Sequence, residues 1–246
     1  MTDSTPDIRS VIDTRRSDRI PDDAADTLAH LLAVRVSCRA FHPEPVPRAT
    51  ITDILTTAQL TASWCNSQSW QLAITSGAGT ERLRAALNAA ATSGEAQTPD
   101  FEFPREYRGV HRDRRRASGF ALYESLGIER DDHAGRLRQT MQNLNFFGAP
   151  HVAIVHVDEA LGPYGAVDCG GFVSNVLLAA TAHGVGSVAQ AALAMYPDTL
   201  RAELGLGDDR RIVCGISFGY PDVDHPSNGY RTTRAPIEEV VDWVTD

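Results

Sequence analysis

The stretch His151-Val-Ala-Ile-Val-His-Val157 decides the class of fold, because it is a nearly continuous apolar run of strand length. Such a run is typical of a strand that other elements cover on both faces of its sheet. Gly148-Ala-Pro150 breaks the chain immediately before it. The sequence therefore predicts a buried strand over residues 151–157, inside a sheet that is covered on both sides.

Outward from this strand, apolar residues recur at helical spacing in several segments. They predict helices over residues 24–34, 50–60, 80–91 and 167–183, and a short helix after Pro197. The helix over 167–183 is apolar or small almost all round and ends at Gly184, so it must be buried in the core or in a subunit interface. Residues 70–75 and 211–218 are predicted to be further strands, which gives a mixed order of α and β elements.

The composition is that of an ordinary soluble globular protein, with 42% apolar and 22% charged residues in a chain of 246. A formal net charge of −9 argues against nucleic acid as a partner. The N-terminus has no signal-peptide core and no uninterrupted apolar run approaches membrane-spanning length. We therefore expect a reduced, cytoplasmic protein that contacts no membrane.

The basic residues and the cysteines exclude several kinds of chemistry. All 23 basic residues are arginine, which excludes a Walker phosphate loop and any lysine Schiff base. Phosphate, if bound, must be held by arginine forks and hydroxyls. The four cysteines lie far apart without the spacing of metal ligands, so we expect no metal site.

Two segments fall outside the regular pattern. Residues 1–22 mix Asp, Arg, Ser and Pro without a hydrophobic period, which predicts a flexible N-terminal arm before a domain over 23–246. Residues from about 93 to 146 combine prolines and an arginine cluster with more aromatic residues than a disordered linker contains. This segment is predicted to be an inserted helical lid.

Arginine and hydroxyl clusters lie near both ends of the chain. Arg35-Val-Ser-Cys-Arg39 places two guanidinium groups around a hydroxyl, and Arg231-Thr-Thr-Arg-Ala-Pro236 is a second cluster of this kind. Charge-assisted hydrogen bonds from such groups can hold a phosphate dianion. Either cluster alone could also be a solvated basic turn.

A polar loop with two indoles, Thr61-Ala-Ser-Trp-Cys-Asn-Ser-Gln-Ser-Trp70, follows the second predicted helix. Its serine, asparagine and glutamine side chains can read the edge of an amide-like heterocycle, and an indole can cover an aromatic plane. The alternative is that Trp70 belongs to the core and Cys65 is an inert small residue. A third segment, residues 186–193, is predicted to be an apolar loop that presents backbone N–H groups to a ligand.

Taken in order, these pieces resemble the FMN-dependent nitroreductase family. RVSCRAF, from residue 35, is similar to its R-R-S-x-R-x-F signature, TASWCNSQSW to its A-P-S-x-x-N-x-Q-P-W, and the GYP segment with RTTRAPIEEV to its closing motif. The region after residue 100 also resembles a branch that includes nitrobenzoate reductases. The chain departs from the pattern where Ala62 and Ser69 replace prolines, Val36 replaces an arginine and Thr232 replaces a lysine.

The resemblance implies an α+β fold with a central, mostly antiparallel sheet flanked by helices, in an intertwined homodimer that binds FMN at its interface. It assigns the FMN phosphate to Arg35, Ser37, Arg39 and Arg234, with Arg231 as a further positive charge. It places Ser63, Trp64 and Asn66 against the flavin of the partner subunit, and Ala189, Gln190 and Ala191 along the isoalloxazine ring, mainly through backbone groups. Asn143 is expected at the pyrimidine edge. Phe101, Phe103, Tyr107 and Tyr123 are candidates for a substrate lid or, equally, for core packing.

The activity implied by the resemblance is ping-pong reduction of nitroaromatic or quinone-like acceptors with NADH or NADPH as the transient hydride donor. This order needs no G-x-G-x-x-G fingerprint, and the sequence contains none. Other flavin enzymes on the same fold stay open: a dehydrogenase, a dehalogenase or a flavin-fragmenting enzyme. A flavin-binding protein without catalytic activity is the alternative from another class.

Overall fold

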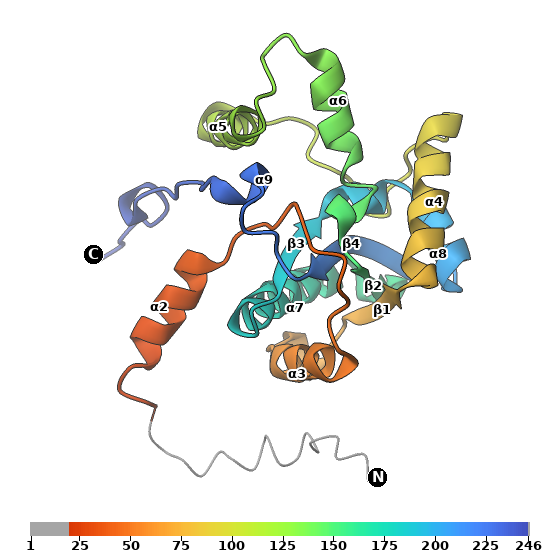
Figure 1. Cartoon of the computed structure of the whole chain (residues 1–246). Helices are drawn as coiled ribbons and strands as arrows, with labels where there is room; N and C mark the ends of the chain where they lie inside the picture. The colour runs from red at the N-terminus through yellow and green to blue at the C-terminus, as the bar shows by residue number, and fades with distance from the viewer. Residues whose placement is uncertain (1–19, 246) are drawn as a thin grey trace.

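The computed structural model describes residues 20–245 and is built around a four-stranded sheet (Figure 1). The strands are β1 (Gln71–Ser76), β2 (His151–Asp158), β3 (Gly186–Gln190) and β4 (Arg210–Gly219), in the order β1-β2-β4-β3. All three neighbouring pairs are antiparallel. The α+β class and the predicted antiparallel character of the sheet are therefore confirmed.

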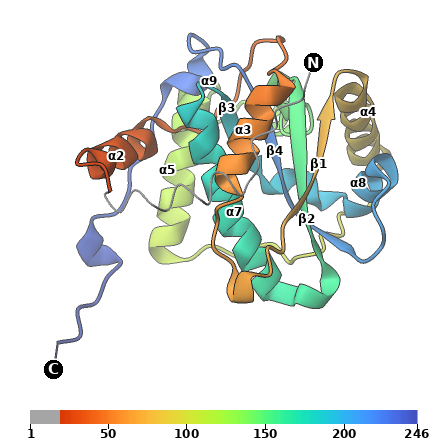
Figure 2. The same ribbon diagram turned by 90° about the horizontal axis from the view of Figure 1, so that it is seen from below.

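Helices cover both faces of this sheet (Figures 1 and 2). On one face lie α3 (Arg48–Ala58) and α7 (Gly162–Ala182), and on the other lie α4 (Ala78–Ser93) and α8 (Pro197–Leu204). Because side chains alternate along a strand, β2 supplies Ala153 and Val155 to the first core and Val152 and Ile154 to the second. The prediction of a strand buried on both faces is confirmed.

The long helix α7 begins five residues earlier than predicted and ends where the sequence placed its end. Gly184 has φ 69°, and the N–H of Val185 donates to the carbonyl of Ala180 at 2.9 Å, as in a helix that closes through a left-handed residue. Together with the turn before it, α7 is long and apolar enough to cross a membrane, but its buried face packs on the sheet and α3. Its opposite face is exposed at Tyr164 and Val167.

The first predicted helix is present as α2 (Ala24–Val34), and none of its residues is buried. The short α9 (Pro226–Gly229) follows β4, and the chain then runs to its C-terminus with one 3-10 turn, Ile237–Glu239. The arm predicted for residues 1–22 lies mostly outside the described residues and stays a prediction.

Residues 186–193 are not a loop, which corrects the sequence prediction. Their first half is β3, which pairs with β4 from Gly186↔Gly219 to Gln190↔Gly215, and their second half begins the 3-10 turn Ala191–Met195. Glycine, serine and alanine have low strand propensity, but pairing with the long neighbouring strand outweighs it.

The segment between residues 93 and 146 contains two helices, α5 (Gly109–Ser125) and α6 (His133–Met141). They lie together on one side of the molecule, away from α3 (Figure 1). Cation–π contacts hold this segment: Arg115 stacks on Tyr107 at 5.1 Å and Arg136 on Tyr123 at 5.3 Å.

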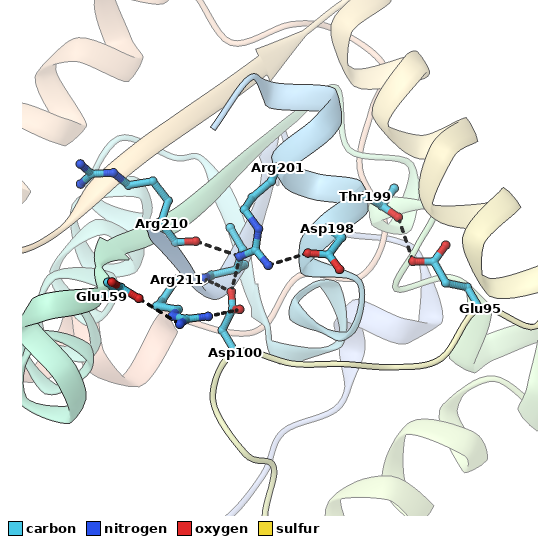
Figure 3. Close-up of polar contacts among 9 residues, drawn as sticks. Glu95, Asp100, Glu159, Asp198, Thr199, Arg201, Arg210 and Arg211 are labelled. Carbon is cyan, nitrogen blue, oxygen red and sulfur yellow. Dashed lines mark hydrogen bonds and ion pairs between the residues drawn. The ribbon is translucent and has the colours of Figure 1, made fainter. Parts of the chain in front are cut away.

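The base of this segment is fixed by the buried carboxylate of Asp100 (Figure 3). Its side chain is 4% exposed and accepts from Arg201 of α8 at 2.8 Å, from Arg211 of β4 at 3.3 Å and from the backbone N–H of Ile212 at 2.7 Å. A buried charge is tolerated when it is paired and hydrogen-bonded in this way. Asp100 therefore anchors the start of the inserted segment to the sheet.

Candidate functional site

The two arginine clusters, which are almost 200 residues apart in sequence, meet at one cavity of about 280 Å³. The end of α2 with the segment after it, the middle of α5 and the chain around α9 form its walls. Five residues predicted to bind phosphate line it together: Arg35, Ser37, Arg39, Arg231 and Arg234. Ser118 of α5 and Tyr230 also line this cavity, and no sequence motif pointed to them.

The guanidinium groups of this cavity keep free donors. Arg39 donates through Nη1 to the hydroxyl of Tyr230 at 2.7 Å and to the carbonyl of Ser37 at 3.2 Å. Arg231 and Arg234 also form their hydrogen bonds through Nη1 alone. Among residues 20–245, none of the ion pairs joins a carboxylate to these three arginines or to Arg35. The cavity therefore carries uncompensated positive charge, which suits a dianion.

Asn228 joins the two halves of this cavity, and sequence reasoning missed it. Its amide nitrogen donates to the carbonyls of Ala40 at 2.9 Å and Asp222 at 2.7 Å, while its oxygen accepts from the backbone N–H of Arg39 at 2.7 Å. The residue is buried. An asparagine in a Pro-Ser-Asn-Gly stretch predicts only a turn, so nothing in the sequence pointed to this role.

The end of β3 lies next to Asn143. Gln190 is 3% exposed, and its amide nitrogen donates to the backbone oxygen of Asn143 at 3.0 Å and to the side-chain oxygen at 3.2 Å. Ser217 of β4 donates to the other end of the Gln190 amide. Ala189 and Ala191, on either side, are exposed. This is the pattern expected if backbone groups, rather than the Gln190 side chain, face a ligand.

The loop of residues 61–70 lies elsewhere, against α7. Within the described chain, Ser63, Trp64 and Asn66 are not among the residues that line the arginine cavity. The indole of Trp64 is exposed and meets the ring of Tyr164 edge-on, with centroids 4.3 Å apart. Trp70, by contrast, is buried and stacks on Phe172 at 4.8 Å, so it is a core residue as one of the two interpretations held.

The four aromatic residues of the predicted lid do not gather in one place. Phe101 packs against the core on the α7 side of the sheet. Tyr107 and Tyr123 each stack under an arginine of the inserted segment, and Tyr123 also lines a separate cavity of about 380 Å³. Phe103 is half-buried.

The buried Cys38 and Cys169 and the half-buried Cys214 have raised pKa values, which disfavour a thiolate. Burial raises the pKa of Cys38, and it raises the pKa of Cys169 to about 11 and that of Cys214 to about 12, so all three stay protonated at neutral pH. Cys65 is exposed. In the part of the chain that the structure describes, no group of three or more His, Cys, Asp or Glu side chains could hold a metal ion.

Comparisons with known proteins agree with this geometry. The model of the nitroreductase family matches residues 32–220. The nitroreductase NfnB of Mycolicibacterium smegmatis is 39% identical over 219 residues, which are 88% of this chain and 92% of the relative. A 4-nitrobenzoate reductase of Pseudomonas putida is 32% identical over 85% of this chain and 92% of its own length.

A solved structure shows the same likeness in three dimensions. The FMN-dependent nitroreductase NfnB from Mycobacterium smegmatis, in complex with NADPH, superposes with a TM-score of 0.86 at 37% identity. The likeness covers 91% of this chain and 100% of that structure. Sequence motifs, fold and relatives agree, and this chain belongs to the nitroreductase family.

Proposed function

We propose that this chain is an FMN-dependent oxidoreductase that uses NADH or NADPH to reduce nitroaromatic or quinone-like acceptors. The observation that carries the proposal is the meeting of Arg35, Arg39, Arg231 and Arg234 at one cavity without a carboxylate partner among the described residues. The names of the relatives point to the same reaction, because they include an FMN-dependent nitroreductase in complex with NADPH and a 4-nitrobenzoate reductase.

The residues present fit FMN. The arginine forks and the Ser37 hydroxyl supply the donors that a terminal phosphate needs, and the lack of lysine leaves this task to arginine. Ala189 and Ala191 are exposed at the end of β3, and Gln190 holds Asn143 beside them. When bound, FMN accepts a hydride from a reduced nicotinamide and returns electrons to a second substrate. The chain's task is to bind the cofactor, orient it and supply donors that stabilise negative charge on it.

A homodimer is part of the proposal, and exposed apolar surface supports it. Leu28 and Leu32 of α2 are 50% and 54% exposed, Val167 of α7 is 66% exposed and Trp243 near the C-terminus is 80% exposed. α2 and α7 contact one another, and apolar surface that extends over neighbouring elements often marks a protein interface. A second copy that covers α2, α7 and the C-terminal segment would bury them.

The positions of the two halves of the site also favour two subunits. Thr181, near the C-terminal end of α7, lines a cavity together with Val36 and Arg231, next to the arginine cavity. The loop with Ser63, Trp64 and Asn66 contacts Asp168 near the other end, roughly 20 Å away along the helix. A partner subunit placed against α7 could bring its own loop to this subunit's cavity.

Three further parts of the proposal concern the rest of the chain. The segment 93–146, with α5 and α6, would act as the lid over the acceptor, and residues 23–246 would form a single FMN-binding domain. The protein would act in the cytoplasm, where reduced nicotinamide is available and thiols such as Cys65 stay reduced.

Anaerobic reduction of the FMN-loaded protein tests the function. We expect NADH or NADPH to bleach the visible absorbance of the oxidised flavin. A nitroarene or a quinone should then restore this absorbance. Titration with each nicotinamide separately identifies the donor. Purified protein that takes up no FMN would refute the proposal. Tight FMN binding without reduction by either nicotinamide would favour a binding protein, and reoxidation by a halogenated phenol but not by nitroarenes would favour a dehalogenase.

A further inference from the structure

The loop of residues 61–70 is held in a backbone conformation that it does not favour by itself. Cys65, Asn66 and Gln68 have φ angles of 51°, 55° and 48°. Such left-handed conformations are uncommon for residues other than glycine and cost free energy unless neighbouring contacts fix them. Three of them within four residues therefore require an external support.

At Gln68 the support is local: its N–H donates to the Ser63 hydroxyl at 2.9 Å, and its side-chain oxygen accepts from Gln59 at 3.0 Å. Further support comes from one carboxylate on α7. Asp168 accepts from the backbone N–H of Trp64 at 3.2 and 3.3 Å, from the hydroxyl of Ser67 at 3.3 Å and, more weakly, from that of Ser69 at 3.5 Å. In residues 20–245, Asp168 takes part in no ion pair. Its hydrogen bonds to other segments go to this one loop.

A second polar residue of α7 holds the start of the loop. Asn175 lies two helical turns after Asp168, on the same face, and donates to the hydroxyl of Thr61 at 2.7 Å. Between them, Gly171 lies beside the loop, because a Cβ at this position would be in van der Waals contact with the Thr61 methyl group at 3.5 Å. The same face of α7 thus supports the loop at both ends.

Ser69 adds a contact that proline could not make. It stands where the resembled motif has proline, and its hydroxyl donates to the carbonyl of Gly165 at 3.1 Å. At position 69 this chain lacks the rigid ring of proline, and the contact of the Ser69 hydroxyl with α7 holds the loop instead.

We propose that Asp168 is a positioning residue for flavin binding. It fixes the loop so that Trp64 and Asn66 stay exposed, toward the flavin of a second subunit, while the Ser63 hydroxyl accepts from the N–H of Gln68 at 2.9 Å within the loop. This inference rests on the proposed function, because it needs that loop to contact FMN. Asp168 itself would not touch the cofactor and would act only through the loop.

The test is the rate at which the holoenzyme releases FMN after dilution, measured by the recovery of flavin fluorescence. Asp168→Asn keeps the size of the side chain but removes the charge, and we expect release about tenfold faster, since hydrogen bonds to a charged group are lost. Ser67→Ala removes one hydrogen bond between the loop and Asp168, and we expect the release of FMN to become about threefold faster. The double variant should be no faster than Asp168→Asn alone, because both changes break the same interaction.

Two further measurements separate positioning from general destabilisation. Excess FMN should restore the kcat of Asp168→Asn to the wild-type value, because only cofactor retention is affected. Asp198→Asn, a matched change at an exposed carboxylate of α8, on the opposite face of the sheet from α7, should release FMN at the wild-type rate.

The outcomes are distinct. Wild-type protein that binds no FMN would refute the proposed function and this inference together. The inference alone would be overturned if Asp168→Asn released FMN at the wild-type rate. It would also be overturned if the release rate of the double variant rose by the product of the two single effects. If Asp168→Asn does not fold, an unchanged release rate in the milder Ser67→Ala variant would still overturn it.

Discussion

Arg39 is the residue with the most varied contacts in the arginine cavity. Its side chain donates to Tyr230 at 2.7 Å and stacks at 5.9 Å from the rings of Phe147 and Tyr230. These contacts fix the direction of the guanidinium group before a ligand arrives. Because several arginines line this cavity, an anion that binds there is attracted by all of their positive charges.

Replacement of Arg39 should therefore weaken the binding of FMN strongly. For Arg39→Ala we expect the Kd to rise about 10- to 100-fold, which corresponds to the loss of one or two charge-assisted hydrogen bonds. The Kd of Arg39→Lys should lie between those of the wild type and Arg39→Ala, since lysine keeps the charge but lacks the planar guanidinium fork. Fluorescence titration of FMN measures both, with Arg82→Ala, an exposed arginine of α4, as control. A Kd for Arg39→Ala within twofold of wild type would contradict the phosphate assignment.

The sequence predicted the residues that line the arginine cavity better than the residues that hold the surrounding segments in place. Arg35, Ser37, Arg39, Arg231 and Arg234 were predicted from two motifs, and the fold brings them to one cavity. Asn228 and Asp168 were missed because their importance lies in hydrogen bonds to segments far away in sequence. Whether the predicted residues bind FMN stays a prediction.

Among the elements, β2 carries two buried histidines whose ionisation opposes folding. Burial lowers the pKa of His151 and of His156 below their ordinary value of 6.5, and the positive charge of Arg210 lowers that of His156 further. The unfolded chain thus takes up these protons first as the pH falls. Both histidines contribute their full stability above about pH 6.5, and this contribution is lost as the pH falls from there through their folded pKa values.

His156→Phe should reduce this pH dependence. The ring is buried and its Nδ1 has no hydrogen-bond partner within the described residues, so phenylalanine can replace it with little polar loss. Urea unfolding at pH 7.5, 6.5 and 5.5, at one protein concentration, measures the change. We expect the wild type to lose more stability over this range than His156→Phe, with the exposed His111→Gln behaving as wild type. Equal slopes would show that His156 does not titrate on unfolding.

The Asp100 anchor ties the inserted segment to α8 and β4, and its removal should destabilise the fold. In Asp100→Asn, Arg201, whose side chain is only 12% exposed, loses its buried partner. We expect a loss of about 2–4 kcal/mol in the free energy of unfolding, because Arg201 and the Ile212 N–H lose a buried charged partner and Arg201 keeps only the exposed Asp198. Asp198→Asn is the matched control, since Asp198 binds the same arginine but is 75% exposed, and a surface pair contributes about 1 kcal/mol or less. Equal losses in chemical denaturation would show that burial of Asp100 is not the cause.

Helical elements could be predicted from their periodicity, whereas β3 could not. The patterns of α2, α3 and α4 repeat every three to four residues, and α7 is a long run of apolar and small residues that ends at a glycine, so a single chain segment contains each signal. The strand β3 has the sequence Gly-Ser-Val-Ala-Gln and exists because β4 pairs with it. Its prediction would have needed knowledge of that partner strand.

For the whole molecule, the proposed homodimer leads to a prediction of the surface that a second copy covers. The exposed face of α7 carries Tyr164 and Val167, and glycine and serine residues follow on the same side. Small residues allow two helices to approach closely. If two copies meet along α7, each loop of residues 61–70 lies beside the partner, which the shared flavin site requires.

Val167→Glu tests this arrangement. A carboxylate on the exposed face of α7 is harmless in a monomer but would be buried without a partner in the dimer. We expect the variant to elute as a monomer in size-exclusion chromatography with light scattering and to lose FMN, because each site of the proposed dimer needs both subunits. Leu137→Glu, on α6 and 63% exposed compared with 66% for Val167, is the control and should stay dimeric with FMN bound. A Val167→Glu variant that remains dimeric would place the interface elsewhere, and one that becomes monomeric yet retains FMN would show that a single chain completes the site.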